Sequence, residues 1–138
     1  MTQPRSFTPE QIAAIEDDSV RLLQEMIRIP SVNFGDGKGD EKAVAEYVAA
    51  QLAEVGIESE FVIAGENRWS VVATISGSDN KRPGLVVHGH IDTVPADASD
   101  WSIDPWSGEI KDDFIWGRGA VDMKDGCAQF LAIVRGWK

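Results

Sequence analysis

The chain has 138 residues, of which 43% are hydrophobic and 26% charged, and its formal net charge is −10. This composition is typical of one globular domain that is long enough to bury a core, and it excludes a disordered chain. An acidic surface repels phosphate groups, so we expect neither nucleic acid nor a membrane surface as a partner.

Three further features predict a soluble, cytoplasmic protein. Cys127 is the single cysteine, which excludes an internal disulfide and a multi-cysteine zinc cage. Residues 1–9 lack the apolar stretch that a signal peptide requires. No run of 18 apolar residues is present that would predict a transmembrane helix.

The first predicted element is an amphipathic helix. Thr8 is a suitable N-cap, Pro9 suits the first helical position, and Gln11 stands where a capping box needs its partner. Apolar residues then recur at helical spacing until Pro30, which ends the pattern.

A loop and a second helix follow. Residues 33–40 are rich in glycine and aspartate, which predicts a loop. We expect the helix over residues 41–55, with Asp40 as its cap and Gly56 just beyond its end.

The rest of the chain predicts strands and a last helix. Strand patterns cover residues 57–63 and 69–75, and the apolar run 85–87 predicts a short strand buried on both faces. A hairpin is expected near residues 111–113, and the apolar segment 127–137 predicts a buried helix. Because helices and strands interleave, the sequence predicts an α/β fold with a largely parallel sheet.

Two candidate functional residues come directly after the run 85–87. His90 and Asp92 are two positions apart, so in extended backbone their side chains share one face. A neutral imidazole is a good zinc ligand, and a carboxylate beside it fixes its tautomer. The pair is equally compatible with a hydrogen-bonded strand end. His88 would share the same face, although a packed strand histidine is the simpler interpretation.

A third candidate, Asp122, stands just ahead of the last predicted helix. Glycines at positions 117 and 119 allow a tight turn before it. Asp122 is then either a cap of that helix or a metal ligand, since a carboxylate has two oxygens and can bridge a metal pair.

The motifs around these residues resemble those of a known enzyme family. The segments GHIDTVP, DPWSGEI and WGRGAVDMKDG, together with IRIPSVN at the end of the first helix, resemble the zinc peptidase and deacylase family. That family includes glutamate carboxypeptidase, aminoacylase, acetylornithine deacetylase and succinyl-diaminopimelate desuccinylase. The resemblance covers nearly the whole chain.

The resemblance implies a role for each candidate. His90 would bind one zinc, Asp92 would hold the histidine and assist catalysis, and Asp122 would bridge two zinc ions, for which cobalt or manganese could substitute. The implied reaction is hydrolysis of the amide bond of an N-acyl amino acid or short peptide. The implied fold is the N-terminal part of a three-layer α/β/α catalytic domain, and the whole protein would carry a second domain that often dimerises.

Residues that the family requires for catalysis are missing from the sequence. A glutamate pair supplies the general base and a ligand in the family, and no carboxylate or histidine follows Asp125 here. Residues 1–138 are therefore expected to be the N-terminal portion of the catalytic domain, without its remaining segment and its lid or dimerisation domain. Two alternatives stay open: a non-catalytic relative that binds metal weakly or serves as an interaction module, and a nucleotide-binding α/β domain. The family has glycine where Asp125 stands, and we expect Asp125 to cap the helix.

Overall fold

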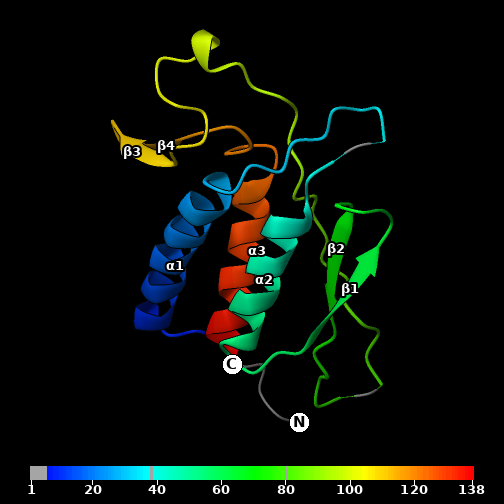
Figure 1. The fold of residues 1–138 in the computed structure, drawn as a ribbon. Helices are drawn as coiled ribbons and strands as arrows, with labels where there is room; N and C mark the ends of the chain where they lie inside the picture. Colours follow the sequence, from blue (N-terminus) through cyan, green and yellow to red (C-terminus); the bar gives the residue numbers. More distant parts are fainter. Residues whose placement is uncertain (1–5, 38, 80) are drawn as a thin grey trace.

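The computed structural model describes residues 6–37, 39–79 and 81–138. Within these residues the chain forms three α-helices, two β-hairpins and a short 3₁₀ turn (Figure 1). In chain order they are α1 (Pro9–Ile27), α2 (Lys42–Ala53), β1 (Ser59–Ile63), β2 (Trp69–Ala73), η1 (Ala98–Asp100), β3 (Glu109–Lys111), β4 (Phe114–Trp116) and α3 (Lys124–Trp137).

The three α-helices build the core. α1 packs along α3, while α2 contacts α3 on one side and the β1–β2 hairpin on the other (Figure 1). Full burial of a large aliphatic side chain stabilises a fold by about 1.5–3 kcal/mol, so this cluster holds the helices together. Its buried members are Leu22, Leu23, Met26, Ile27, Val44, Leu52, Ile57, Ala128, Leu131 and Ala132.

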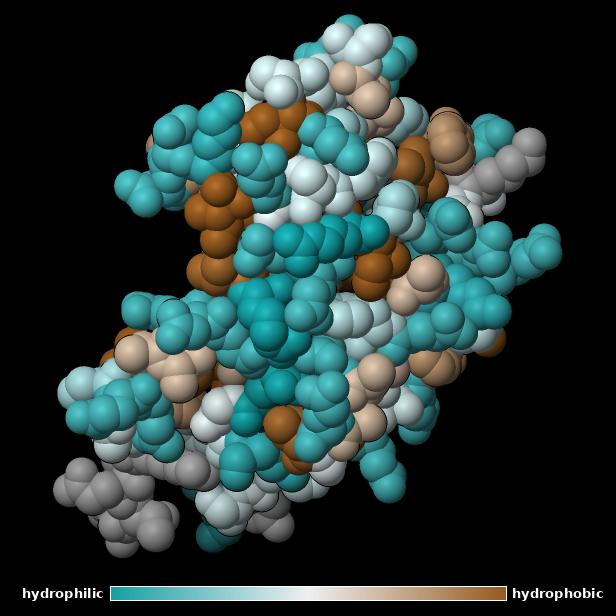
Figure 2. All heavy atoms as spheres, turned by 60° about the vertical axis from the view of Figure 1, so that its left-hand side comes forward, coloured by the Kyte–Doolittle hydropathy of each residue, from teal (hydrophilic) through white to brown (hydrophobic). Residues whose placement is uncertain are grey.

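Helix α1 confirms the capping prediction. The hydroxyl of Thr8 accepts a hydrogen bond from the backbone N–H of Gln11, and the Gln11 side chain accepts one from the Thr8 N–H. The helix ends at Ile27, three residues before Pro30. Figure 2 brings forward the side of the molecule on which α1 lies, and most of that face is hydrophilic. The buried side chains of α1 are Leu22, Leu23, Met26 and Ile27, all near its C-terminal end.

The start of α2 differs from the prediction. The N-cap is Glu41 rather than Asp40, and no side chain caps the helix. The backbone N–H groups of Glu41 and Lys42 instead donate to the carbonyl of Asn67, in the turn between β1 and β2. A tertiary contact thus replaces the local cap. The helix ends at Ala53, two residues before the predicted end, and Gly56 closes the turn that follows it with φ +72°.

The predicted buried strand over residues 85–87 is wrong. The segment forms no strand, and the side chains of Leu85, Val86 and Val87 are 88%, 83% and 53% exposed. In the described part of the chain the strands of the middle region, β1 and β2, pair only with each other, antiparallel, and no strand flanks residues 85–87. Without neighbours on both sides, the apolar run cannot be covered.

The hairpin near residues 111–113 is confirmed. β3 and β4 pair antiparallel, with Lys111 opposite Phe114. Asp112 and Asp113 between them have φ values of 53° and 62°. Positive φ at both central residues is the geometry of the two-residue type I′ turn, whose twist matches that of the strands it joins.

The fold is mixed α/β, as predicted, but its two described sheets are small and antiparallel. The one parallel pairing among the described residues is the isolated bridge between Val32 and Thr93. The three-layer arrangement with a largely parallel sheet therefore stays a prediction.

The last helix, α3, is longer and less buried than predicted. It begins at Lys124 rather than at residue 127, and Phe130, Ile133 and Trp137 are 37–44% exposed. No helix in the described part of the chain combines the length and apolarity that crossing a membrane requires.

Candidate functional site

The three residues singled out by the sequence meet at one place. The Nε2 atom of His90 lies 2.9 Å from Oδ1 of Asp122, 32 positions further along the chain. The Nδ1 atom of His90 lies 3.1 Å from Oδ1 of Asp92 and 3.1 Å from the Asp92 carbonyl oxygen. The imidazole is thus held between two carboxylates.

A fourth residue, Asn33, completes the hydrogen-bond chain. Its side-chain amide donates a hydrogen bond to Oδ2 of Asp92 at 2.8 Å. One oxygen of that carboxylate therefore contacts Asn33 and the other contacts His90. The sequence alone did not indicate a role for Asn33. Its place in the IRIPSVN segment, at the start of a polar loop after a helix, was the available signal.

Backbone pairing explains how the His90 segment is placed. The Thr93 N–H donates to the Ser31 carbonyl, and the Asn33 N–H donates to the Thr93 carbonyl, at 2.9 and 2.8 Å. The Ser31 hydroxyl also donates to the Ile91 carbonyl at 2.6 Å. These bonds tie residues 91–93 to the segment that leaves α1, and the first two form the parallel bridge between Val32 and Thr93.

The lack of a side chain at Gly89 lets the same segment approach α3. A Cβ atom built at Gly89 would lie 2.7 Å from Sγ of Cys127, closer than real Cβ contacts. The Cys127 thiol donates to the His90 carbonyl at 3.3 Å. Burial raises the pKa of this thiol to about 11, which disfavours the thiolate that a nucleophilic cysteine requires.

The site is open to solvent on the Asp122 side. The side chain of Asp122 is 87% exposed, while those of His90 and Asp92 are 47% and 27% exposed. Partial burial of His90 opposes its protonation, but hydrogen bonds to Asp122 and to the Asp92 carbonyl outweigh it and raise the pKa of the imidazole. The peptide bond between Asp122 and Met123 is cis.

The donor atoms suit a transition metal but are few. Zinc bonds to histidine nitrogen and carboxylate oxygen measure about 2.0–2.2 Å, so two atoms 2.9 Å apart can contact one ion. Asp92 on the other ring nitrogen is the outer partner that metal-binding histidines usually have. Among the described residues, however, no group of three or more His, Cys, Asp or Glu side chains converges on a point. Catalytic zinc usually has three protein ligands, so two residues such as His90 and Asp122 are too few to form a complete site by themselves.

The neighbouring polar residues behave differently from their predictions. His88 is exposed, so the prediction of a packed strand histidine is wrong, since residues 85–87 form no strand. Asp125 is not the N-cap of α3; that position is Met123, which makes no side-chain cap. Asp125 lies in the first turn, where a negative charge is favourable toward the helix dipole.

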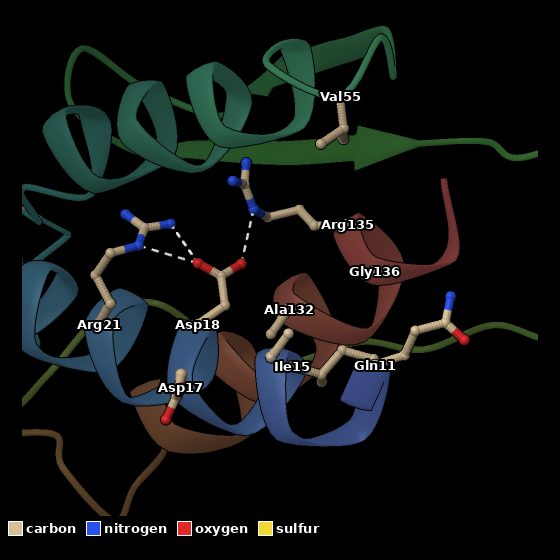
Figure 3. A pocket seen from close by; sticks show the side chains of 10 residues that line it. Gln11, Ile15, Asp17, Asp18, Arg21, Val55, Ala132, Arg135 and Gly136 are labelled. Atoms are coloured by element: carbon tan, nitrogen blue, oxygen red, sulfur yellow. Dashed lines mark hydrogen bonds and ion pairs between the residues drawn. The ribbon is translucent and has the colours of Figure 1, made fainter. Parts of the chain in front are cut away.

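A groove elsewhere on the molecule does not belong to this site. It lies between the N-terminal half of α1 and the C-terminal half of α3 and has a volume of about 630 Å³. Three of its charged groups pair with each other: Asp18 accepts hydrogen bonds from both Arg21 and Arg135 (Figure 3). The groove is thus lined by a structural ion-pair network.

The second part of the chain matches a known protein family. Residues 86–138, which include His90, Asp92 and Asp122, match peptidase family M20/M25/M40. Together with the relatives below, this match confirms the resemblance noted in the sequence: the chain belongs to this family.

Curated relatives match most of the chain. Succinyl-diaminopimelate desuccinylase of Ehrlichia canis (strain Jake) is 32% identical over 85% of the chain, and that of Caulobacter sp. (strain K31) is 36% identical over 97%. The N-fatty-acyl-amino acid synthase/hydrolase of Mus musculus is 32% identical over 93%. The matched residues cover 30%, 31% and 25% of these relatives, so the chain spans less than a third of their length.

Proposed function

We propose that the chain supplies part of the metal site of a hydrolase that cleaves the amide bond of an acylated amino acid or short peptide. One observation carries the proposal: His90 Nε2 faces Asp122 Oδ1 at 2.9 Å while Asp92 holds the opposite ring nitrogen. Family membership and the desuccinylase and acyl-amino acid hydrolase relatives support the reaction class.

In this proposal each residue of the cluster has a separate task. Asp92 accepts the Nδ1–H of His90, so the lone pair of Nε2 is free for the metal. Asn33 keeps the Asp92 carboxylate turned toward the ring through its 2.8 Å hydrogen bond. Asp122 offers two oxygens on an exposed side chain, which suits a bridge between two ions and leaves room for substrate.

The chemistry that a bound metal supplies in such hydrolases is polarisation of the carbonyl and activation of water. The general base and the remaining ligands are not among His90, Asp92 and Asp122, and we propose that they lie in other parts of the whole protein. Residues 1–138 would then form the N-terminal portion of its three-layer catalytic domain. Zinc as the native ion, a cytoplasmic location and a homodimer of the whole protein are further parts of this proposal.

Metal titration of the chain tests the site itself. Co²⁺ gives ligand-field absorption bands whose growth reports affinity. We expect wild type to bind Co²⁺, and His90→Ala and Asp122→Ala to lose at least about tenfold in affinity, because each removes a direct ligand. His88→Ala is the matched control, since this exposed histidine lies two residues away and should leave the affinity unchanged. Equal affinity in all four proteins would contradict the proposed site.

Turnover by the whole protein tests the reaction. Succinyl-diaminopimelate and an N-fatty-acyl amino acid are the two probes that the relatives suggest. Metal-dependent release of the free amino acid from either probe would support the proposal. Metal binding at His90 and Asp122 without any turnover would favour the alternative, a non-catalytic metal-binding relative.

A further inference from the structure

The first residue of α3, Lys124, is completely buried. Its side chain has no solvent exposure, and its Nζ atom donates to the carbonyl oxygens of Met26 and Ile29, each at 2.8 Å. Burial lowers the pKa of its ammonium group to about 8. A buried cationic group is costly unless it is hydrogen-bonded, and the two carbonyls provide those bonds at the negative end of the α1 dipole.

Lys124 is also directly connected to the loop that carries Asp122. Its backbone N–H donates to the Gly119 carbonyl at 2.9 Å and so closes residues 119–124 into a compact turn. This turn is packed tightly, because a Cβ atom at Gly119 would lie 2.6 Å from Cγ2 of Thr93 and 3.4 Å from Cδ of Lys124. Asp122 lies within this turn, two residues before Lys124.

The chain segment that accepts the Lys124 hydrogen bonds continues directly into the segment that contacts residues 91–93, next to His90. The Ile29 carbonyl accepts a hydrogen bond from the Lys124 ammonium group. Two and four residues further on, Ser31 and Asn33 form backbone hydrogen bonds with Thr93. The segment that follows α1 therefore contacts both halves of the site. Hydrogen bonds to Ile91, Asp92 and Thr93 hold the His90 segment, and Lys124 holds the turn that contains Asp122.

We propose that Lys124 is a positioning residue that holds Asp122 beside His90 by anchoring the 119–124 turn to the C-terminal end of α1. The proposal rests on the proposed function in one respect: its consequence for metal binding requires the metal site. The positioning of Asp122 itself does not require a metal.

The test compares Lys124→Met with Leu131→Ala. The methionine is similar in length but leaves both carbonyls without their donor. Leu131 is buried in the same helix, and its truncation destabilises the core without touching the turn. We expect Lys124→Met to bind Co²⁺ roughly 10–100-fold more weakly than wild type, as when an outer partner of a metal ligand is lost. Leu131→Ala should retain wild-type affinity. Lys124→Arg, which keeps a cation with N–H donors, should bind more tightly than Lys124→Met.

A second readout works without metal. In wild type, the ring protons of His90 should give nuclear Overhauser contacts to residues 121–123; Lys124→Met should lose them, and Leu131→Ala should keep them. If wild type binds no Co²⁺ but these contacts respond as expected, the proposed function fails and the positioning role stands.

Unchanged affinity and unchanged contacts in Lys124→Met would overturn the positioning role and leave Lys124 as a cap of α1. An equal loss in Leu131→Ala would also overturn it, since the effect would then follow stability alone. If Lys124→Met does not fold, Lys124→Gln replaces it under the same criteria.

Discussion

The side-chain amide of Asn33 donates a 2.8 Å hydrogen bond to the carboxylate of Asp92, although the two residues lie 59 positions apart. This contact joins the loop after α1 to the candidate site. It leaves the second carboxylate oxygen of Asp92 directed at His90. Asn33 therefore acts on His90, the proposed metal ligand, through Asp92.

Asn33→Ala should weaken Co²⁺ binding about tenfold, because Asp92 loses the partner that fixes its orientation toward His90. The measurement is the same absorption titration as for the site variants. Asn67→Ala is the control, since Asn67 is exposed and supports α2 through its backbone carbonyl, which the substitution keeps. The role assigned to Asn33 would have to be abandoned if both variants bound like wild type.

The ion pairs of Asp18 should make stability depend on pH. Burial of Asp18 by itself raises its pKa, but hydrogen bonds from Arg21 and Arg135 outweigh this and lower it. A carboxyl group whose pKa is lowered by folding stabilises the fold above its ordinary pKa, and this contribution is lost as the pH falls through the folded-state value. Asp18→Asn should thus cost about 1–2 kcal/mol at pH 7, and the difference should shrink below about pH 4.

Urea unfolding of wild type and Asp18→Asn between pH 7 and pH 3 measures this difference. Asp17→Asn is the matched control, because the neighbouring carboxylate is exposed and should leave the unfolding free energy nearly unchanged at every pH. A cost of Asp18→Asn that stayed constant down to pH 3 would contradict the assignment.

Gly119→Ala should destabilise the fold by about 1–3 kcal/mol. Gly119 has φ +82°, which a side chain disfavours, and the added methyl group would lie 2.6 Å from Cγ2 of Thr93. Gly77→Ala is the control, because no atom lies within 4 Å of its Cβ position and its φ is not positive; it should stay within about 0.5 kcal/mol of wild type. Similar unfolding midpoints in urea for both variants would show that the 119–124 turn is less tightly packed than described.

Cys127 should react slowly with thiol reagents in the native protein. Burial raises its pKa to about 11, so at pH 8 the thiolate population falls by roughly two orders of magnitude relative to a free cysteine. The rate of reaction with a chromogenic disulfide, measured with and without denaturing urea, gives the comparison. Reaction of the folded protein at the rate of the unfolded one would show that the thiol is accessible.

Elements with local causes could be predicted from the sequence. The capping box at Thr8 and Gln11, the positive-φ glycine shortly after α2 and the turn at residues 112–113 depend on backbone and side-chain chemistry within a few residues. The motifs around His90 and Asp122 also identified the family, since the residue types and their order are enough for that.

Predictions that depend on distant partners were less accurate. The N–H groups at the start of α2 are satisfied by the carbonyl of Asn67, about 25 residues away. No local sequence pattern predicts this contact. Likewise the apolar run 85–87 predicts a buried strand. Burial of such a strand requires neighbouring strands, and among the described residues none pairs with this run.

The sequence by itself determined the approximate positions of the three helices, the β3–β4 turn, the family and the residue types of the candidate site, because these follow from short-range chemistry and from motifs. Only the tertiary structure decided that His90 and Asp122 are in contact, that Asn33 supports Asp92, and that the lysine of the DMKDG motif is buried against the end of α1. These relationships join segments 32 to 98 positions apart. Their physical basis is the packing of α1 against α3, which brings carbonyl, amide and carboxylate groups within hydrogen-bond distance.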